Sequence, residues 1–142
     1  MKEFRLLIIV SLAFLTAFGQ AKPRLATLAQ QKVCAEQAKK TFHEDNPTRP
    51  AHMVTWEYTS HYDASMNVCY IMTHFAQVKD STVNVSYSVY DAFEGRGYAS
   101  FIQINPKGRP FCEITPPSRD SLSCGSSDEF EVLVDKYFGI GR

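Results

Sequence analysis

The chain contains 142 residues, of which 44% are hydrophobic and 21% charged, with 15 basic and 15 acidic side chains. Because the charges balance and form no block of one sign, the sequence lacks the basic footprint of nucleic-acid binding and the polybasic patch of lipid binding. One Trp, seven Tyr and ten Phe favour a packed domain over a disordered chain.

Residues 1–21 are predicted to be a cleavable signal peptide. Lys2 and Arg5 precede an apolar run over residues 6–18, and small residues follow it, as in export signals. An uncleaved membrane anchor is the alternative reading. The apolar run has thirteen residues, however, and a spanning helix needs roughly 20.

The remaining chain, residues 22–142, is predicted to be one exported domain. Small residues at the required positions place the cleavage before Lys22 or before Gln20. The 121 residues after position 21 suit a single hydrophobic core. Removal of residues 1–21 takes away two basic residues and one acidic residue. The remaining chain has 13 basic and 14 acidic residues, a formal charge of −1. We expect a secreted or periplasmic protein without membrane attachment after cleavage.

Residues 25–43 predict an amphipathic helix, which Pro47 and Pro50 follow. Lysines and glutamates occupy one side of this helix. Its apolar side chains fall within one arc of the helical wheel: Leu28, Cys34, Ala35, Ala38 and Phe42.

Four strands and a short fifth strand at an edge are predicted next. Alternating apolar and polar residues indicate half-buried strands, and a stretch that is apolar on both faces indicates a strand in the middle of the sheet. Tight turns with glycine separate some of them. The expected strands are 54–62, 68–76 (apolar on both faces), 83–89, 98–104 and 111–115.

A second helix is predicted near the C-terminus. Ser126 and Glu129 match a capping box, and Gly139 suits the end of the helix. Phe130, Leu133, Val134, Tyr137 and Phe138 share an apolar face; Asp128, Glu131 and Asp135 share the opposite one. The fold class is therefore α+β: an antiparallel four- to five-stranded sheet flanked by an N-terminal and a C-terminal helix. We expect both helices on one face of the sheet.

Four cysteines after residue 21 indicate a disulfide-bonded domain. An even number in an exported chain predicts two disulfides, with three alternative pairings. We favour Cys34–Cys69 and Cys112–Cys124, because the second pair is close in sequence and encloses a turn-rich stretch. A zinc site is the alternative, but zinc modules usually place two ligands roughly two to four residues apart, which no two cysteines satisfy.

Candidates for catalysis are weak. His43, His52, His61 and His74 include no pair at the spacing of a helical zinc site, so we predict no metal and no cofactor. No nucleophile elbow or phosphate-binding glycine loop is present in the sequence. We therefore assign no catalytic residue.

An enzyme of unrecognised type is the alternative. His61, Asp91 and Glu94 are its only candidates. Asp91 and Glu94 would point to opposite faces of a strand and converge only where the chain bends.

Binding is the more favoured class of function. If Cys34 bonds to Cys69, one face of the 68–76 strand faces a helix and the other carries Tyr70, Met72 and His74, the candidate binding residues. Aromatic rings suit partner recognition, and an aromatic face away from the helices is a further hypothesis. Its candidates are Trp56, Tyr58, Tyr62, Tyr70, Tyr87, Tyr90, Tyr98 and Phe101.

Five short motifs resemble those of small secreted bacterial proteins of uncharacterised function. They are Cys-x-x-Gln-Ala, Tyr-x-Ser-His-Tyr, Asn-x-Cys-Tyr, Asp-Ala-Phe-Glu-Gly and Phe-x-x-Leu-Val-x-x-Tyr, at 34–38, 58–62, 67–70, 91–95 and 130–137. The resemblance covers nearly the whole exported part and implies neither an activity nor a site residue.

Export, disulfides and small size together predict a non-enzymatic binding module or an enzyme inhibitor of the cell envelope. Its expected partner is an envelope or extracellular protein or glycan. A structural role in the envelope is a further alternative.

Overall fold

The computed structural model describes residues 25–117 and 119–141, so the predicted signal peptide lies outside the described residues. The sheet is antiparallel, and its spatial order β1-β2-β3-β4-β5 follows the chain. The α+β prediction is confirmed, including the short fifth strand at an edge. The elements are α1 (Leu28–Asp45), β1 (Met53–Asp63), β2 (Val68–Lys79), β3 (Thr82–Asp91), β4 (Gly97–Ile104), β5 (Phe111–Ile114) and α2 (Ser127–Phe138).

Helix α1 buries a narrower stripe than its sequence predicted. Cys34, Ala38 and Phe42, each four residues from the next, are buried. Leu28, placed on this stripe from the sequence, is 82% exposed, and Ala35 is exposed as well. The prediction was wrong for these two residues because only the i, i+4, i+8 row of the helix meets the sheet.

Both helices begin with a side-chain cap. At α1, Thr27 and Gln30 form a reciprocal capping box that the sequence analysis missed. At α2, the Ser126 hydroxyl accepts a hydrogen bond from the Glu129 amide, whereas the Glu129 carboxylate accepts one from the Gly125 amide instead of Ser126. Only half of the predicted capping box therefore forms at α2.

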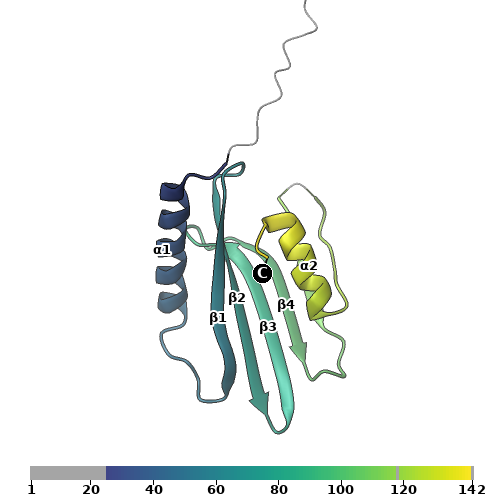
Figure 1. The fold of residues 1–142 in the computed structure, drawn as a ribbon. Coiled ribbons are helices and arrows are strands. Elements are labelled where there is room, and N and C mark those ends of the chain that lie inside the picture. The colour runs from purple at the N-terminus through teal and green to yellow at the C-terminus, as the bar shows by residue number, and fades with distance from the viewer. Residues whose placement is uncertain (1–24, 118, 142) are drawn as a thin grey trace, which may run out of the picture.

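The two helices lie on opposite faces of the sheet, and the expectation of one shared face was wrong (Figure 1). Neighbouring residues of a strand point to opposite faces. On β2, Cys69 and Ile71 join the buried cluster against α1, while Tyr70 joins the cluster that contains Phe130 of α2. A strand that is apolar on both faces needs cover on both faces, and the two helices supply it.

Both predicted disulfides are present. Cys34–Cys69 joins α1 to β2, and Cys112–Cys124 joins β5 to the segment before α2. Each disulfide therefore fastens one helix layer to the sheet. By loop entropy alone, bridges of this span stabilise a fold by about 3–4 kcal/mol each.

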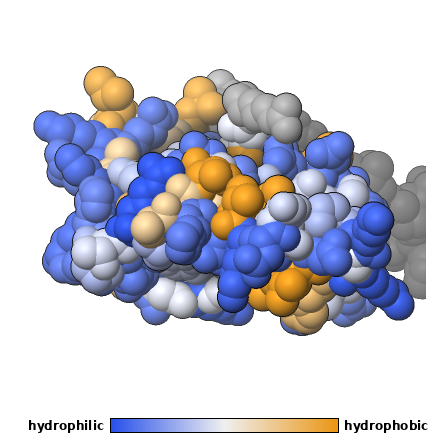
Figure 2. All heavy atoms as spheres, turned by 90° about the horizontal axis from the view of Figure 1, so that it is seen from below, coloured by the Kyte–Doolittle hydropathy of each residue, from blue (hydrophilic) through white to orange (hydrophobic). Residues whose placement is uncertain are grey.

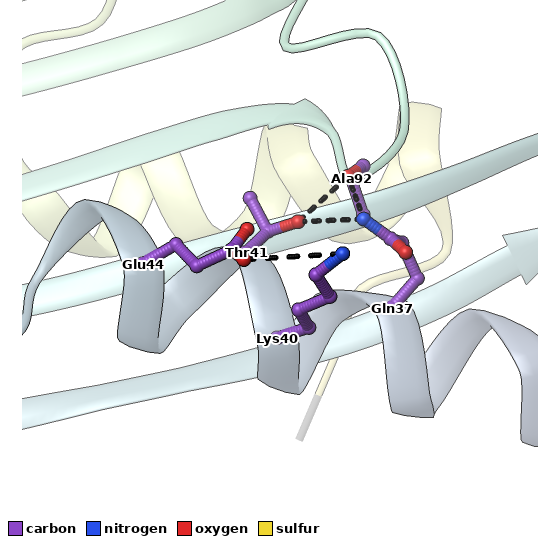
Figure 3. Close-up of polar contacts among 5 residues, drawn as sticks. All are labelled: Gln37, Lys40, Thr41, Glu44 and Ala92. Atoms are coloured by element: carbon purple, nitrogen blue, oxygen red, sulfur yellow. Dashed lines mark hydrogen bonds and ion pairs between the residues drawn. The ribbon is translucent and has the colours of Figure 1, made fainter.

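Helix α1 is also held to the turn between β3 and β4 (Figure 3). The side chains of Gln37 and Thr41 donate hydrogen bonds to the carbonyl oxygen of Ala92, at 3.1 and 2.8 Å. Lys40 and Glu44 form an exposed ion pair on the same helix, at 3.8 Å. The partly buried side of α1 thus contacts the β3–β4 turn, and the charged pair Lys40–Glu44 faces solvent.

Apolar side chains at the surface do not form one continuous face at the end of the molecule seen in Figure 2, where separate patches lie among hydrophilic residues. Ile104 and Phe111, near the β4–β5 connection, are the most exposed of the large apolar residues in those two strands. Neither of the described helices has the length and apolar character needed to cross a membrane.

Candidate functional site

An open cleft of about 830 Å³ lies beside α2. Helix α2 contacts β4 and β5 and leaves the same face of β1 and β2 partly uncovered. We call this space the α2 cleft. Its sheet side includes Glu57, Thr59, Met72, His74 and Tyr87, and its helix side includes Asp128, Glu131, Val132 and Asp135.

The strand register explains the floor of the α2 cleft. Glu57 of β1 pairs with His74 of β2, and His74 pairs with Tyr87 of β3. Directly opposite residues of antiparallel strands point to the same face, so the three side chains form one row across the sheet. The row lies on the face of the sheet that carries α2, in the part that the helix does not cover.

This row forms a continuous polar network. Glu57 Oε1 lies 3.1 Å from His74 Nδ1. The His74 ring stacks on the Tyr87 ring, and the Tyr87 hydroxyl donates a hydrogen bond of 2.9 Å to Glu131 of α2. The network therefore links the edge strand β1 to α2, and so joins the sheet side of the cleft to its helix side.

The lining is strongly acidic. Glu57, Asp128, Glu131 and Asp135 carry carboxylates. Among the described lining residues, His74 is the single basic group and none is Lys or Arg. The chain as a whole has equal numbers of acidic and basic residues. Negative charge is therefore concentrated at this site.

The predicted binding residues fall into two groups. Met72 and His74 line the α2 cleft. Tyr70 is completely buried, with its ring 5.2 Å from Tyr98 and 5.1 Å from Phe138 between ring centroids. Tyr70 is thus a core residue beneath α2.

The environment of Tyr70 raises its pKa to about 12. Burial is the main cause, and the neighbouring Tyr98, Asp63 and Asp91 add to it, while Arg96 acts in the opposite direction. Tyr70 is therefore neutral at physiological pH.

The three candidate catalytic residues do not meet in the cleft. His61 and Asp91 lie in one row across the sheet with the buried Tyr70 between them. The Asp91 carboxylate accepts hydrogen bonds from the amides of Phe93 and Glu94, at 2.7 and 3.1 Å, and so holds the turn. Glu94 is exposed in that turn, and none of the three candidates lines the α2 cleft.

The C-terminal cap of α2 positions His61. Gly139 has φ +65°, the left-handed conformation that suits glycine, and a Cβ atom added there would lie 3.0 Å from His61 Nε2. His61 therefore packs closely against the helix end. His61 thus has a packing contact at the end of α2 and does not line the cleft.

The hypothesis of an exposed aromatic face was wrong. Its eight rings divide between the two buried clusters: Trp56, Tyr58, Tyr62 and Tyr90 pack against the α1 cluster, whereas Tyr70, Tyr87, Tyr98 and Phe101 belong to the α2 cluster. All four cysteines are paired, so none is available as a zinc ligand. Within the described residues, no three His, Cys, Asp or Glu side chains form a metal-binding group.

Sequence reasoning missed most of the α2 cleft. The alternation predicted for the 54–62 strand puts Glu57 on its polar face, and Asp128, Glu131 and Asp135 were placed on the acidic face of the last helix. Only the position of α2 on the sheet brings these two faces together. The sequence shows a polar strand face and an acidic helix face. To predict that they form one site, one would also need to know which face of the sheet α2 covers.

Comparison with known proteins gives no match to a family model, a curated protein or a solved structure. The resemblance to small secreted bacterial proteins therefore stays a prediction.

Proposed function

We propose that the protein is exported and acts as a non-enzymatic binding module in the cell envelope or outside the cell, with the α2 cleft as its binding surface. Its partner is an envelope or extracellular protein or glycan, and inhibition of an envelope enzyme is one role of this kind. The two disulfides support export, because such bonds persist in oxidising compartments.

The observation that carries the proposal is the preformed α2 cleft. Its volume of about 830 Å³ falls within the range of roughly 300–1,000 Å³ for ligand sites. Its floor is held by the contacts from Glu57 through His74 and Tyr87 to Glu131. A site that is ordered before binding loses less conformational entropy when the ligand arrives.

Site-specific photo-crosslinking in the native cells tests this proposal. A photoreactive amino acid at Thr59 would lie in the cleft, and the same amino acid at Lys39 would lie on the exposed side of α1. We expect a discrete crosslinked species from the Thr59 position only. Absence of any Thr59 adduct, or equal adducts from both positions, would contradict a binding role for the cleft.

A further inference from the structure

We propose that the occupant of the α2 cleft is an extended peptide segment that carries lysine or arginine side chains. This inference rests on the proposed binding function and names the chemistry of its partner. Three features of the cleft support it: the unpaired carboxylates of Asp128 and Asp135, the spacing of acidic residues along α2, and the cover of His74 over the Tyr87 ring.

Charge is the first feature. The exposed glutamates Glu36 and Glu44 of α1 have lysine partners on the same helix, each at 3.8 Å. In the described part of the chain, Asp128 and Asp135 make no ion pair or side-chain hydrogen bond. Asp128 and Asp135 are therefore two cleft carboxylates without a cationic partner among the described residues, and a cationic ligand complements them.

Spacing is the second feature. Asp128, Glu131 and Asp135 follow one side of α2 on successive turns, about 5 Å apart along the axis. In an extended peptide, side chains on the same side repeat about every 7 Å. Because lysine and arginine side chains are long and flexible, alternate basic residues reach successive turns of the helix. Glu57 on the sheet side contacts His74 but its side chain is 65% exposed, so it can also be reached by the side chains that point the other way.

Apolar contact adds to this fit. Met72 of the sheet and Val132 of the helix lie among the carboxylates, and Val132 is 66% exposed. The methylene groups of a lysine or arginine side chain pack on such residues while the charged end reaches a carboxylate. A small inorganic cation would leave these apolar groups unused.

The third feature favours a peptide over a glycan. Sugars usually bind through contact with exposed aromatic rings, which provide a large contact area. In the α2 cleft the Tyr87 ring is 6% exposed and His74 stacks on it, with ring centroids 4.2 Å apart. The cleft therefore offers carboxylates to a ligand but no open ring face on Tyr87.

Fluorescence anisotropy with a labelled hexa-lysine peptide, acetylated and amidated, tests the inference on the oxidised protein isolated after export. We expect saturable binding that weakens as salt rises from about 0.05 M to about 0.5 M, because salt screens exposed charges. Hexa-glutamine of the same length should not bind.

Matched variants locate the site. D128N/D135N removes two carboxylates from the cleft, and E113Q/D120N removes two exposed carboxylates elsewhere. We expect the first variant to weaken hexa-lysine binding about tenfold and the second less than about twofold. Thermal unfolding of both variants verifies that the fold is intact.

Several results would overturn the inference. Equal binding by both double variants places the peptide outside the cleft, and tighter binding of a glucosamine oligomer than of hexa-lysine assigns the cleft to a cationic glycan. Crosslinking at Thr59 without hexa-lysine binding would leave the binding function standing and refute the cationic peptide alone. Absence of both would contradict the two proposals together.

Discussion

His74 stacks on Tyr87 with ring centroids 4.2 Å apart and ring planes inclined by 10°. The two residues are directly opposite on β2 and β3, so the stack follows from the strand register. It joins the contact with Glu57 to the hydrogen bond between Tyr87 and Glu131. One aromatic pair thereby connects Glu57 on the sheet side of the α2 cleft to Glu131 on its helix side.

Replacement of His74 tests the importance of this stack. H74A removes the ring contact and the Glu57 partner, so we expect the free energy of unfolding to fall by about 1–2 kcal/mol. Denaturant unfolding measures the change. H52A, at an exposed position before β1, is the matched control and should change stability by less than about 0.5 kcal/mol. Equal losses in both variants would refute the role of the stack.

Two apolar residues of α1 should respond very differently to truncation. Phe42 is buried among the Trp56, Tyr58 and Phe75 rings, so F42A is expected to destabilise the protein by about 3–5 kcal/mol. Leu28 is 82% exposed, so L28A should cost less than about 0.5 kcal/mol. The two variants are compared by their denaturant midpoints, provided that the denaturant dependence of the unfolding free energy (the m-value) is unchanged. A large loss of stability in L28A would show that Leu28 belongs to the buried stripe, as the sequence predicted.

Removal of either disulfide should loosen one helix layer while the other stays attached. C112S/C124S opens the link to the α2 layer, and we expect a stability loss of about 3 kcal/mol. Amide hydrogen exchange should then speed up in β5 and α2 before α1. C34S/C69S should show the reverse order, since its bridge fastens α1. Identical exchange patterns in the two variants would argue against separate layers.

Alkaline pH should destabilise the fold through Tyr70. Burial raises the pKa of this residue from 10.0 to about 12 in the folded state. The stabilising effect is complete below pH 10 and is lost as the pH rises towards 12, because the unfolded chain ionises first. This linkage amounts to at most about 3 kcal/mol.

Urea unfolding at pH 9 and pH 11 measures this effect, with Y70F as the comparison. The variant should lose less stability than the wild type over this interval. Tyr90 and Tyr98 also have pKa values raised chiefly by burial, so a smaller decline should persist in Y70F. An equal decline in both proteins would exclude Tyr70 as a contributor.

The order of elements and both disulfides could be predicted from the sequence because the relevant patterns are local. Alternation fixes strands, the apolar stripe from Phe130 to Phe138 fixes α2, and cysteine spacing favoured the correct pairs. The face that each helix covers is a long-range property. Both faces of β2 are apolar, which fits cover on both sides, but the sequence does not show which element covers the second face.

The candidate site was only half predictable for the same reason. Met72 and His74 were identified from the strand face opposite Cys69, and they line the cleft. Tyr70 shares that face but lies under Phe138 of α2. Helix α2 covers β2 at Tyr70 but not at Met72 and His74, so the first is a core residue and the other two line the cleft. Where this cover ends depends on how α2 packs on the sheet.

Mapping of amide chemical shifts during titration with hexa-lysine tests the central claim, that the α2 cleft is the binding surface. The largest changes are expected at Glu57 and Thr59, at Met72 and His74, and along residues 128–135. Helix α1, whose glutamates already have lysine partners, should stay unchanged. Changes concentrated in α1, or spread evenly over all exposed carboxylates, would contradict the account.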